Sequence, residues 1–495
     1  MSADENDMPQ PMLAAATVVE PEPEEDKEHD WEPEHAAEPN AAQRTRVEDD
    51  LLDRGDHVEI GAMLLRDLGA IGKPVYSDGA IHLYRPERGV FELQREDELS
   101  RHVQGYAGMA VFQGNGLPTK ALKLKAPDIR GAIKLASDRI TLPDFFAEAP
   151  PGVSFRDVFV RVTASGITTH AHSPDHRAKH AYPFAFDATP SAPLARFLEA
   201  LFRDDVDKHE KIAAFQEHAG ASLLGIATKY QRAIVLQGEG NNGKSALLTL
   251  ANAAMPPGST CSIPPQEWAQ EYRRAMLAGR RYNFVSELPE AEIIASEAFK
   301  AIVSGDQTTG RHIRDAPFSF HPVAGHVFAA NRLPGTNDQT WGFWRRVLVL
   351  TFCRDFTNDP TRDPHAAEKI IQHELPRAVS WMLQGAVRLI SQKDYTIPPS
   401  HEAALKAWRR QADQVAAWAD ENVTPSPIGQ GTMGKDVYAA FRAWALENGH
   451  RPPASNVFGE RMRKLTMGAV HTEAGSVYTI TIHGHRNLCQ PRAGC

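Results

Sequence analysis

The sequence predicts an α/β fold with a parallel sheet at its centre, and three observations in residues 231–395 predict it. Apolar strand-like runs alternate with helical patterns, a glycine-rich loop joins the first strand to the first helix, and polar residues follow the later strands. Such alternation favours parallel strands with helices on both faces of the sheet. The predicted strands are Ala233–Leu236, Tyr282–Val285, Gly325–Ala330 and Val347–Thr351.

The composition is that of a globular protein. A length of 495 residues suggests two to four domains, and 42% hydrophobic with 24% charged residues excludes a collagen-like or wholly disordered chain. No apolar run approaches the roughly 20 residues of a membrane-spanning helix, and no secretory leader is evident. The four cysteines are scattered without a zinc spacing, so we expect a cytoplasmic location without membrane contact.

The net charge of −9 hides two opposite parts. Residues 1–50 hold 16 acidic and 3 basic residues with several prolines, which predicts a disordered acidic tail. The tail is either a solubilising segment or an arm that mimics DNA or recruits a partner. The other residues hold 47 acids and 51 bases, a weakly basic body that permits nucleic-acid binding without arguing for it.

The domains that precede the sheet are an α/β N-terminal domain at residues 51–190 and a helical lead-in at residues 191–230. The first contains short strand-like runs separated by turn residues, and the second contains apolar residues that recur every three and four positions. The predicted strands are Ala80–Tyr84 and Val158–Val162, and the predicted helices are Asp97–Gly105, Asp128–Ser137, Ala192–Arg203 and Asp207–Leu224.

The sheet domain is expected to end at residue 395, after helices within residues 366–392, because prolines 398 and 399 break the pattern. In residues 396–495, helices alternate with a Pro/Gly-rich loop and precede an alternating stretch that is typical of a hairpin. This order predicts a winged helix. The predicted elements are helices Glu402–Asn422, Lys435–Asn448 and Asn456–Thr466 and a hairpin in Ala469–Ile482.

One motif matches GxxxxGK(S/T) and lies between the first predicted strand and a predicted helix, Ala246–Ala254. Glycines let backbone N–H groups surround phosphates, and the helix N-terminus favours their negative charge. The lysine is expected to reach the β- and γ-phosphates of ATP, and the serine to ligate Mg²⁺. The motif consists of Gly238, Glu239, Gly240, Asn241, Asn242, Gly243, Lys244 and Ser245.

Polar residues that follow two later strands complete the predicted catalytic set. Glu287 follows Tyr282–Val285, where a carboxylate polarises the attacking water or holds the Mg²⁺ shell. Glu290 is a second acid nearby. Asn331 follows Gly325–Ala330, and its amide can both donate and accept a hydrogen bond, as a γ-phosphate sensor requires. Each is also compatible with an ordinary surface loop or turn.

Arg345 and Arg346 stand together before the last predicted strand. In a ring ATPase, one such arginine reaches the γ-phosphate of the neighbouring subunit as an arginine finger. The alternative is an ordinary surface pair.

The order of these motifs resembles superfamily 3 helicases, specifically the phage and plasmid primase–helicase family related to the poxvirus primase–helicase. A further family motif, close to K-x-L-T-G-G-D-x-x-x-x-R, matches this chain from Lys300 to Arg311, although Val303 and Ser304 replace its threonine and glycine. The resemblance covers about residues 80–485 and is most specific in the ATPase motifs. It implies an AAA+-type P-loop core at residues 231–395, ring assembly, typically as a hexamer, and translocation on DNA in a bacterial host cell.

The resemblance also implies DNA contacts in a loop or hairpin that follows the further motif. The candidates there are Lys300, Arg311, His312 and Arg314. In the predicted recognition helix, the candidates are Arg461, Arg463 and Lys464, although 11 bases against 8 acids in residues 396–495 make protein docking nearly as plausible. No primase site is evident, so a separate primase or polymerase is expected.

Weaker signals and rival functions remain. His170, His172, His176 and His180 could suggest a metal site but lack a completing acid or cysteine, and the acidic Asp205-Val-Asp207 is expected to cap a helix. The sequence favours an ATP-dependent replicative DNA helicase. The alternatives are a DNA-binding initiator or assembly factor that uses ATP without unwinding, and another P-loop enzyme such as a packaging motor or small-molecule kinase.

Overall fold

The structure is a computed structural model. The residues that it describes are 52–112, 118–289, 294–313, 316–336, 338, 340–426, 431–449, 452–465, 469–472 and 475–483, so the predicted acidic tail lies outside them. Within these ranges no helix is long and apolar enough to cross a membrane. The chain divides into two compact units, of which the first comprises residues up to 55 together with 108–123.

The described part of the first unit is a small antiparallel ladder. Strand β4 (Ala110–Phe112) pairs with β5 (Pro118–Ala121), and Leu52 forms a parallel bridge with Val111. Leu52, Val111 and Leu122 are buried.

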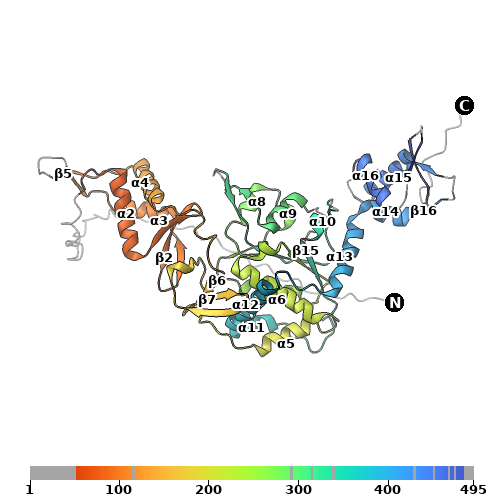
Figure 1. Ribbon diagram of the computed structural model, residues 1–495, viewed down its shortest axis with the longest axis horizontal. Coiled ribbons are helices and arrows are strands. Elements are labelled where there is room, and N and C mark those ends of the chain that lie inside the picture. The colour runs from red at the N-terminus through yellow and green to blue at the C-terminus, as the bar shows by residue number, and fades with distance from the viewer. Residues whose placement is uncertain are drawn as a thin grey trace, which may run out of the picture. The chain divides into compact units, whose positions relative to one another are not determined.

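The second unit begins with helices and two antiparallel sheets (Figure 1). Asp56 starts the first helix, since its carboxylate accepts the backbone N–H groups of Val58 and Glu59. The predicted strands and helices of this region are confirmed, with shifts of one or two residues at their ends. The elements are α2 (His57–Ile71), β1 (Pro74–Ser77), β2 (Ala80–Arg85), β3 (Val90–Leu93), α3 (Glu96–Gln104), α4 (Ala126–Arg139), β6 (Gly152–Ser154), β7 (Phe159–Thr163) and β8 (Gly166–His170).

A five-stranded parallel sheet follows, and it confirms the mixed α/β class with a parallel sheet. Its order is β10-β11-β14-β9-β15, so the first strand in sequence, β9, lies between the last two. All six residues of β14 are buried, as expected of a strand covered on both faces. The bounds are β9 (Ala233–Gln237), β10 (Thr260–Cys261), β11 (Tyr282–Val285), β14 (Gly325–Ala330) and β15 (Val347–Thr351), and they confirm all four predicted strands.

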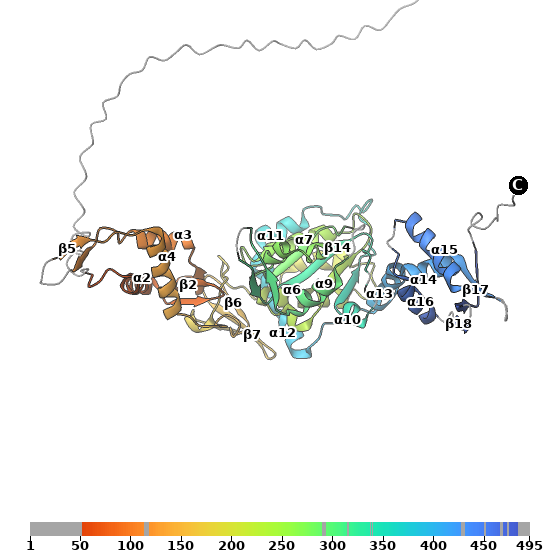
Figure 2. The same ribbon diagram turned by 90° about the horizontal axis from the view of Figure 1, so that it is seen from above.

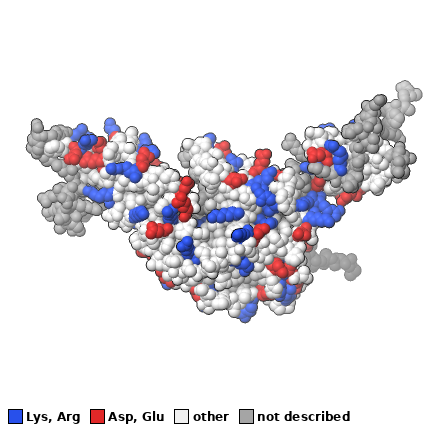
Figure 3. All heavy atoms as spheres, in the orientation of Figure 1, with Lys and Arg blue, Asp and Glu red and all other residues white. Residues whose placement is uncertain are grey.

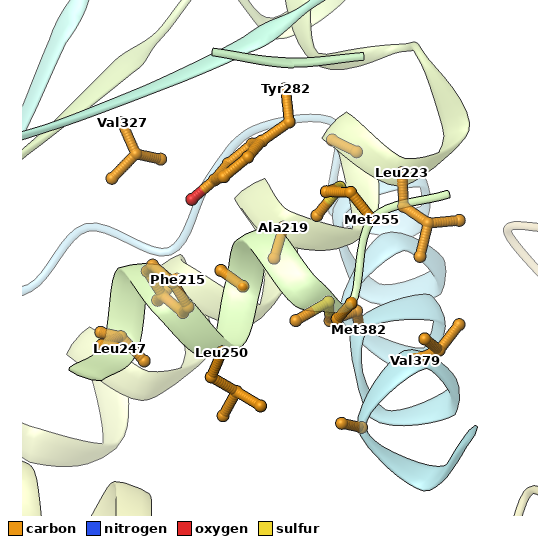
Figure 4. Close-up of a cluster of buried hydrophobic side chains, with 14 of the residues drawn as sticks. Phe215, Ala219, Leu223, Leu247, Leu250, Met255, Tyr282, Val327, Val379 and Met382 are labelled. Atoms are coloured by element: carbon orange, nitrogen blue, oxygen red, sulfur yellow. The ribbon is translucent and has the colours of Figure 1, made fainter. Parts of the chain in front are cut away.

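Side chains alternate along the strands into two separate cores. On β9, Ile234 and Leu236 join the core formed with α6 (Lys208–Leu224), α7 (Lys244–Ala253) and α12 (Leu375–Gln392), part of which is drawn in Figure 4. Ala233 and Val235 join the core on the other face. The helices on that second face are α9 (Ser296–Ser304), α10 (Trp341–Trp344) and α13 (Pro399–Ala412).

Helices α6 and α12 pack side by side beneath the sheet (Figures 1 and 2). A Cβ atom on Gly220 would lie 2.1 Å from the carbonyl oxygen of Met382, and one on Gly385 would lie 2.4 Å from that of Gln216. Glycine is therefore required on both helices for this close approach. The fully buried carboxylate of Glu217 is held across the contact by the side chain of Arg388 at 2.6 Å.

Three further helices of this unit are α5 (Ala192–Leu201), α8 (Glu271–Ala275) and α11 (Ala366–His373). Helices α5, α6 and α7 confirm the predictions for the lead-in and for the segment after the glycine-rich motif, and α11 and α12 confirm helices within residues 366–392. A short ladder pairs β12 (Thr308–Gly310) with β13 (Phe318–Phe320).

The C-terminal region departs from prediction in two places. The single helix expected over Glu402–Asn422 is wrong, because Asp413 ends α13 and caps α14 by accepting the backbone N–H of Val415 and Ala416. Strands β18 and β19 form the expected hairpin ladder, but β20 pairs with β16. The elements are α14 (Gln414–Asn422), β16 (Val423–Pro425), β17 (Thr432–Met433), α15 (Gly434–Glu447), α16 (Ser455–Lys464), β18 (Ala469–Thr472), β19 (Gly475–Tyr478) and β20 (Ile480–Ile482).

Two buried histidines make the free energy of unfolding depend on pH. His218 and His326 are 0% and 1% exposed, and burial lowers the pKa of each imidazole from 6.5 to about 3. The unfolded chain therefore binds these protons from about pH 6.5 downward, whereas the folded chain does not until about pH 3. We expect the free energy of unfolding to be highest above pH 6.5. Below pH 6.5 it should fall by up to about 1.4 kcal/mol per pH unit for each of the two histidines.

Urea unfolding between about pH 7.5 and 5 measures this dependence. His326→Leu is expected to reduce the slope of the free energy of unfolding against pH. The control is His209→Leu, because His209 is exposed. An unchanged slope in His326→Leu and in His218→Leu would contradict the assignment.

Candidate functional site

The carboxyl ends of three neighbouring strands bring the predicted catalytic set together. Lys244 begins the helix that follows β9, Glu287 lies two residues after β11, and Asn331 follows β14 directly. Because the strands are parallel and adjacent, their carboxyl ends meet at one edge of the sheet. These three residues and Ser245 line a cavity of about 380 Å³.

Two glycines of the motif, Gly238 and Gly243, are required by the backbone of the loop. Gly243 has φ +84°, and a Cβ atom there would lie 2.3 Å from Cδ2 of Leu201. A Cβ atom on Gly238 would lie 2.2 Å from Nδ2 of Asn242. The loop can therefore turn tightly from β9 into α7 only with glycine at these positions.

The ammonium group of Lys244 meets only neutral oxygen atoms. Its Nζ donates to the carbonyl oxygens of Gly238 at 2.7 Å and Glu239 at 2.9 Å and to Oδ1 of Asn242 at 2.9 Å, and Oδ1 of Asn331 lies 3.3 Å away. Lys244 is only 7% exposed, and this burial lowers its pKa. A buried cation without a carboxylate partner is suited to bind an anion.

Other groups on the cavity fit a phosphate with a divalent cation. Nδ2 of Asn242 is buried and has no hydrogen-bond partner among the described residues, so it can donate to a ligand. Ser245 is exposed in the first turn of α7, and its hydroxyl and the carboxylate of Glu287 are oxygen ligands of the kind that Mg²⁺ prefers. Glu290 lies outside the described residues.

Arg345 and Arg346 are not at this cavity. They precede β15, whose five residues run parallel to β9, so they lie at the opposite edge of the sheet, about 16 Å along the strands. Nη1 of Arg345 donates to Oε1 of Gln231 at 2.7 Å, and Nε of Arg346 donates to Oγ of Ser304 at 2.8 Å. Neither arginine therefore reaches the cavity of its own chain.

Of the residues predicted to contact DNA from the core, Arg311 and His312 follow β12, whereas Lys300 lies on α9. Lys300 forms an ion pair with Asp338 at 2.8 Å. The guanidinium of Arg311 lies 5.6 Å from the ring centre of Tyr272, and His312 stacks on Phe318. Arg314 lies outside the described residues. In Figure 3, basic side chains gather near the middle of the visible face, around the position where Figure 1 labels α9 and α10.

The predicted recognition helix, α16, presents a mixed surface. Arg461 is only 17% exposed and lies 3.7 Å from Asp413, whereas Arg463 is exposed. Glu460 is also exposed on this helix. Lys464 ends α16, and its side chain lies outside the described ones. The charges on α16 do not by themselves favour DNA over a protein partner.

A larger cavity of about 910 Å³ adjoins the first and shares Asn241, Gly243, Ala246 and Arg362 with it. Its walls come from α5, α11 and the segment that follows β15. Neither Arg362 nor this second cavity was predicted from the sequence. No motif surrounds Arg362, and only the folding of the segment after β15 brings it to the glycine-rich loop.

Two weaker signals have structural explanations. The four histidines of residues 170–180 belong to no cluster of three potential metal ligands among the described residues. Asp207 occupies the N-cap position of α6, as expected, but its side chain accepts no hydrogen bond from the first turn of the helix. Asp205 and Asp207 instead pair with the buried Lys211, and Asp207 also accepts the backbone N–H of Ser400.

One family model and several solved structures are similar to this chain. A family model described as "Family of unknown function (DUF5906)" matches residues 236–346. No curated protein matches the chain. Two apo structures of the NrS-1 C-terminal region resemble it at 10% sequence identity, with TM-scores of 0.44 and 0.42, covering 86% of this chain and 99% of the other. At these values the likeness carries no argument about function.

The conformation of the glycine-rich loop can be tested without a ligand. Gly243→Ala is expected to lower the free energy of unfolding by about 1–3 kcal/mol, because the residue has a positive φ and its Cβ would collide with Leu201. Gly240→Ala is the matched control, since nothing lies within 4 Å of a Cβ atom there. Chemical denaturation of both variants checks the difference, and equal stabilities would contradict the loop geometry.

Proposed function

We propose that this chain is an ATP- and Mg²⁺-dependent DNA helicase of a bacterial phage, prophage or mobile element, and that it works as a ring, typically a hexamer. The observation that carries the proposal is the uncompensated ammonium of Lys244 beside Ser245, Glu287 and Asn331 at one edge of a parallel sheet. This edge is also where the strand order reverses around β9, the usual ligand position in such sheets. The resemblance to superfamily 3 helicases supports the same assignment.

Each residue of the smaller cavity has a proposed role. Lys244 and the N-terminus of α7 bind the phosphates, and Ser245 and Glu287 hold Mg²⁺. The bound metal neutralises charge that develops on the phosphates. Glu287 orients the attacking water and accepts its proton, and Asn331 senses the terminal phosphate by a hydrogen bond from its amide.

The larger cavity is the proposed place for the base and ribose. It continues directly from the glycine-rich loop through Asn241, Gly243 and Ala246. Phe197 and Ile370 supply apolar wall on α5 and α11, which suits a flat base.

Ring assembly is proposed because the site is incomplete in one chain. Arg345 and Arg346 lie at the edge opposite the cavity, so either could act only on a neighbouring copy. Trp341 precedes Arg345 by four residues and is 71% exposed, which is unusual for a side chain that does not join a partner.

DNA is the proposed partner of the core and of the C-terminal region. Ile313, 79% exposed between β12 and β13, and the nearby Arg311 offer apolar and cationic contacts to a strand in the channel. Helices α14, α15 and α16 with the β17-β19-β18 sheet have the order of a winged helix. Priming is assigned to a separate primase or polymerase.

An ATP-gated DNA-binding initiator or assembly factor is the second candidate. The bonds of Arg345 to Gln231 and of Arg346 to Ser304 favour it, because both arginines already have partners in their own chain. Such a protein would bind ATP and assemble but would not unwind DNA.

ATP hydrolysis with and without single-stranded DNA tests the motor. Lys244→Ala is expected to abolish turnover, because it removes the cation that binds the phosphates. Glu287→Gln is expected to reduce turnover at least about 100-fold while ATP binding is retained. Glu297→Gln, an exposed glutamate on α9, is the control. Turnover that DNA does not stimulate, or that survives in Glu287→Gln, would exclude the helicase and favour the second candidate.

Mixing of two inactive variants tests the arginines. Lys244→Ala and Arg346→Ala, each inactive alone, are expected to regain activity in an equal mixture, because about a quarter of the interfaces then pair an intact lysine with an intact arginine. The same mixture with Arg345→Ala identifies which arginine acts. If neither mixture regains ATP hydrolysis, the finger assignment is wrong.

A further inference from the structure

The segment between β15 and α11, residues 352–364, is bonded directly to the glycine-rich loop. The backbone N–H of Phe356 donates to the carbonyl oxygen of Asn241 at 2.9 Å, and Nδ2 of Asn241 donates to Oγ1 of Thr357 at 3.0 Å. The backbone N–H of Phe352 donates to the carbonyl oxygen of Gln237 at 2.8 Å. These hydrogen bonds fix the segment to the glycine-rich loop.

An internal ion pair braces this segment. Arg354 is 3% exposed, pairs with Asp359 and donates to the carbonyl oxygen of Ala200 on α5. Asp359 in turn accepts the backbone N–H of Thr361 at 2.8 Å and its hydroxyl at 2.6 Å. These bonds from Thr361, together with that from Arg354, hold the pKa of the Asp359 carboxyl well below its usual range. The carboxylate therefore stays ionised and fixes the residue that precedes Arg362.

Arg362 lines both cavities and has a free guanidinium. Its backbone N–H donates to the carbonyl oxygen of Asp359, but its side chain makes no hydrogen bond or ion pair with any described residue. The neighbouring cations differ, since Arg354 pairs with Asp359 and Lys369 pairs with Asp363. Arg362 is thus an unpaired cation on the same cavity as Lys244, Glu287 and Asn331.

We propose that Arg362 binds the polyphosphate of the nucleotide in its own chain, as a second cation beside Lys244, and that Asp359 is a positioning residue that holds it there. The inference rests on the proposed function, because it assumes that the smaller cavity takes phosphates. A guanidinium fits phosphate oxygens with two parallel hydrogen bonds. The triphosphate carries more charge than the diphosphate, so Arg362 makes the site prefer ATP over ADP. This contribution differs from that of Arg345 and Arg346, which could serve only another copy.

Equilibrium binding of fluorescent ATP and ADP analogues to the full chain, diluted until it is monomeric, tests the inference. Arg362→Ala is expected to weaken ATP binding about 10- to 100-fold and ADP binding by much less. Arg362→Lys is expected to retain part of the preference, since the charge remains. Arg130→Ala, an exposed arginine on α4 that lines neither cavity, is the matched control and should bind as the unaltered chain does.

The outcomes separate the inference from the function on which it rests. The proposed function fails if the unaltered chain binds no nucleotide. It also fails if Lys244→Ala binds nucleotide as tightly as the unaltered chain. If Lys244→Ala loses binding but Arg362→Ala binds ATP and ADP as the unaltered chain does, the function stands and the inference is overturned. An equal loss of ATP and ADP in Arg362→Ala would also overturn the preference for the triphosphate.

The positioning role of Asp359 has its own test. Asp359→Asn removes the charge with little change of shape, and it should reduce the preference for ATP toward that of Arg362→Ala. When Asp359→Asn is added to Arg362→Ala, it should cause no further loss of ATP binding, because the two substitutions remove the same interaction, that of Arg362 with the nucleotide. A general destabilisation of the fold would instead add its loss in both backgrounds, and that result would overturn the positioning role.

Discussion

The buried, uncompensated charge of Lys244 is the constraint on which the site depends. An ammonium group that is 7% exposed and meets only carbonyl and amide oxygens is held by the curvature of the glycine-rich loop. That curvature requires glycine at Gly243, where Leu201 of α5 closes against the loop. The loop, α5 and α7 are therefore one arrangement, and the core beneath them supports it.

Parallel strand order converts three distant segments into one site. Glu287 and Asn331 are more than 40 residues from Lys244 and from each other in sequence, yet each follows a strand whose carboxyl end reaches the same edge. The same order sends Arg345 and Arg346 to the other edge. One direction of the strands thus explains both why one set of residues converges on the cavity and why the other set lies away from it.

The core of the fold and most of the candidate site could be predicted, whereas the contacts that complete the site could not. The four strands of residues 231–355 were predictable because continuous apolar runs between turn residues mark buried strands. Asp413 ends α13 by a local cap that the apolar periodicity of residues 402–422 concealed. The pairing of β20 with β16, whose partners are 55 to 59 positions apart in the chain, follows from which edges remain unpaired after folding.

Sequence alone determined the local pieces of this protein: the strands, the helices, the glycine-rich turn and the residue types that suit phosphate chemistry. These follow from interactions between residues a few positions apart, which leave a period or a motif in the chain. Tertiary structure decided that α6 and α12 meet through glycines and that Arg362 lies on the cavity of Lys244. These partners are chosen by burial and packing between segments more than a hundred residues apart, and no local pattern records them.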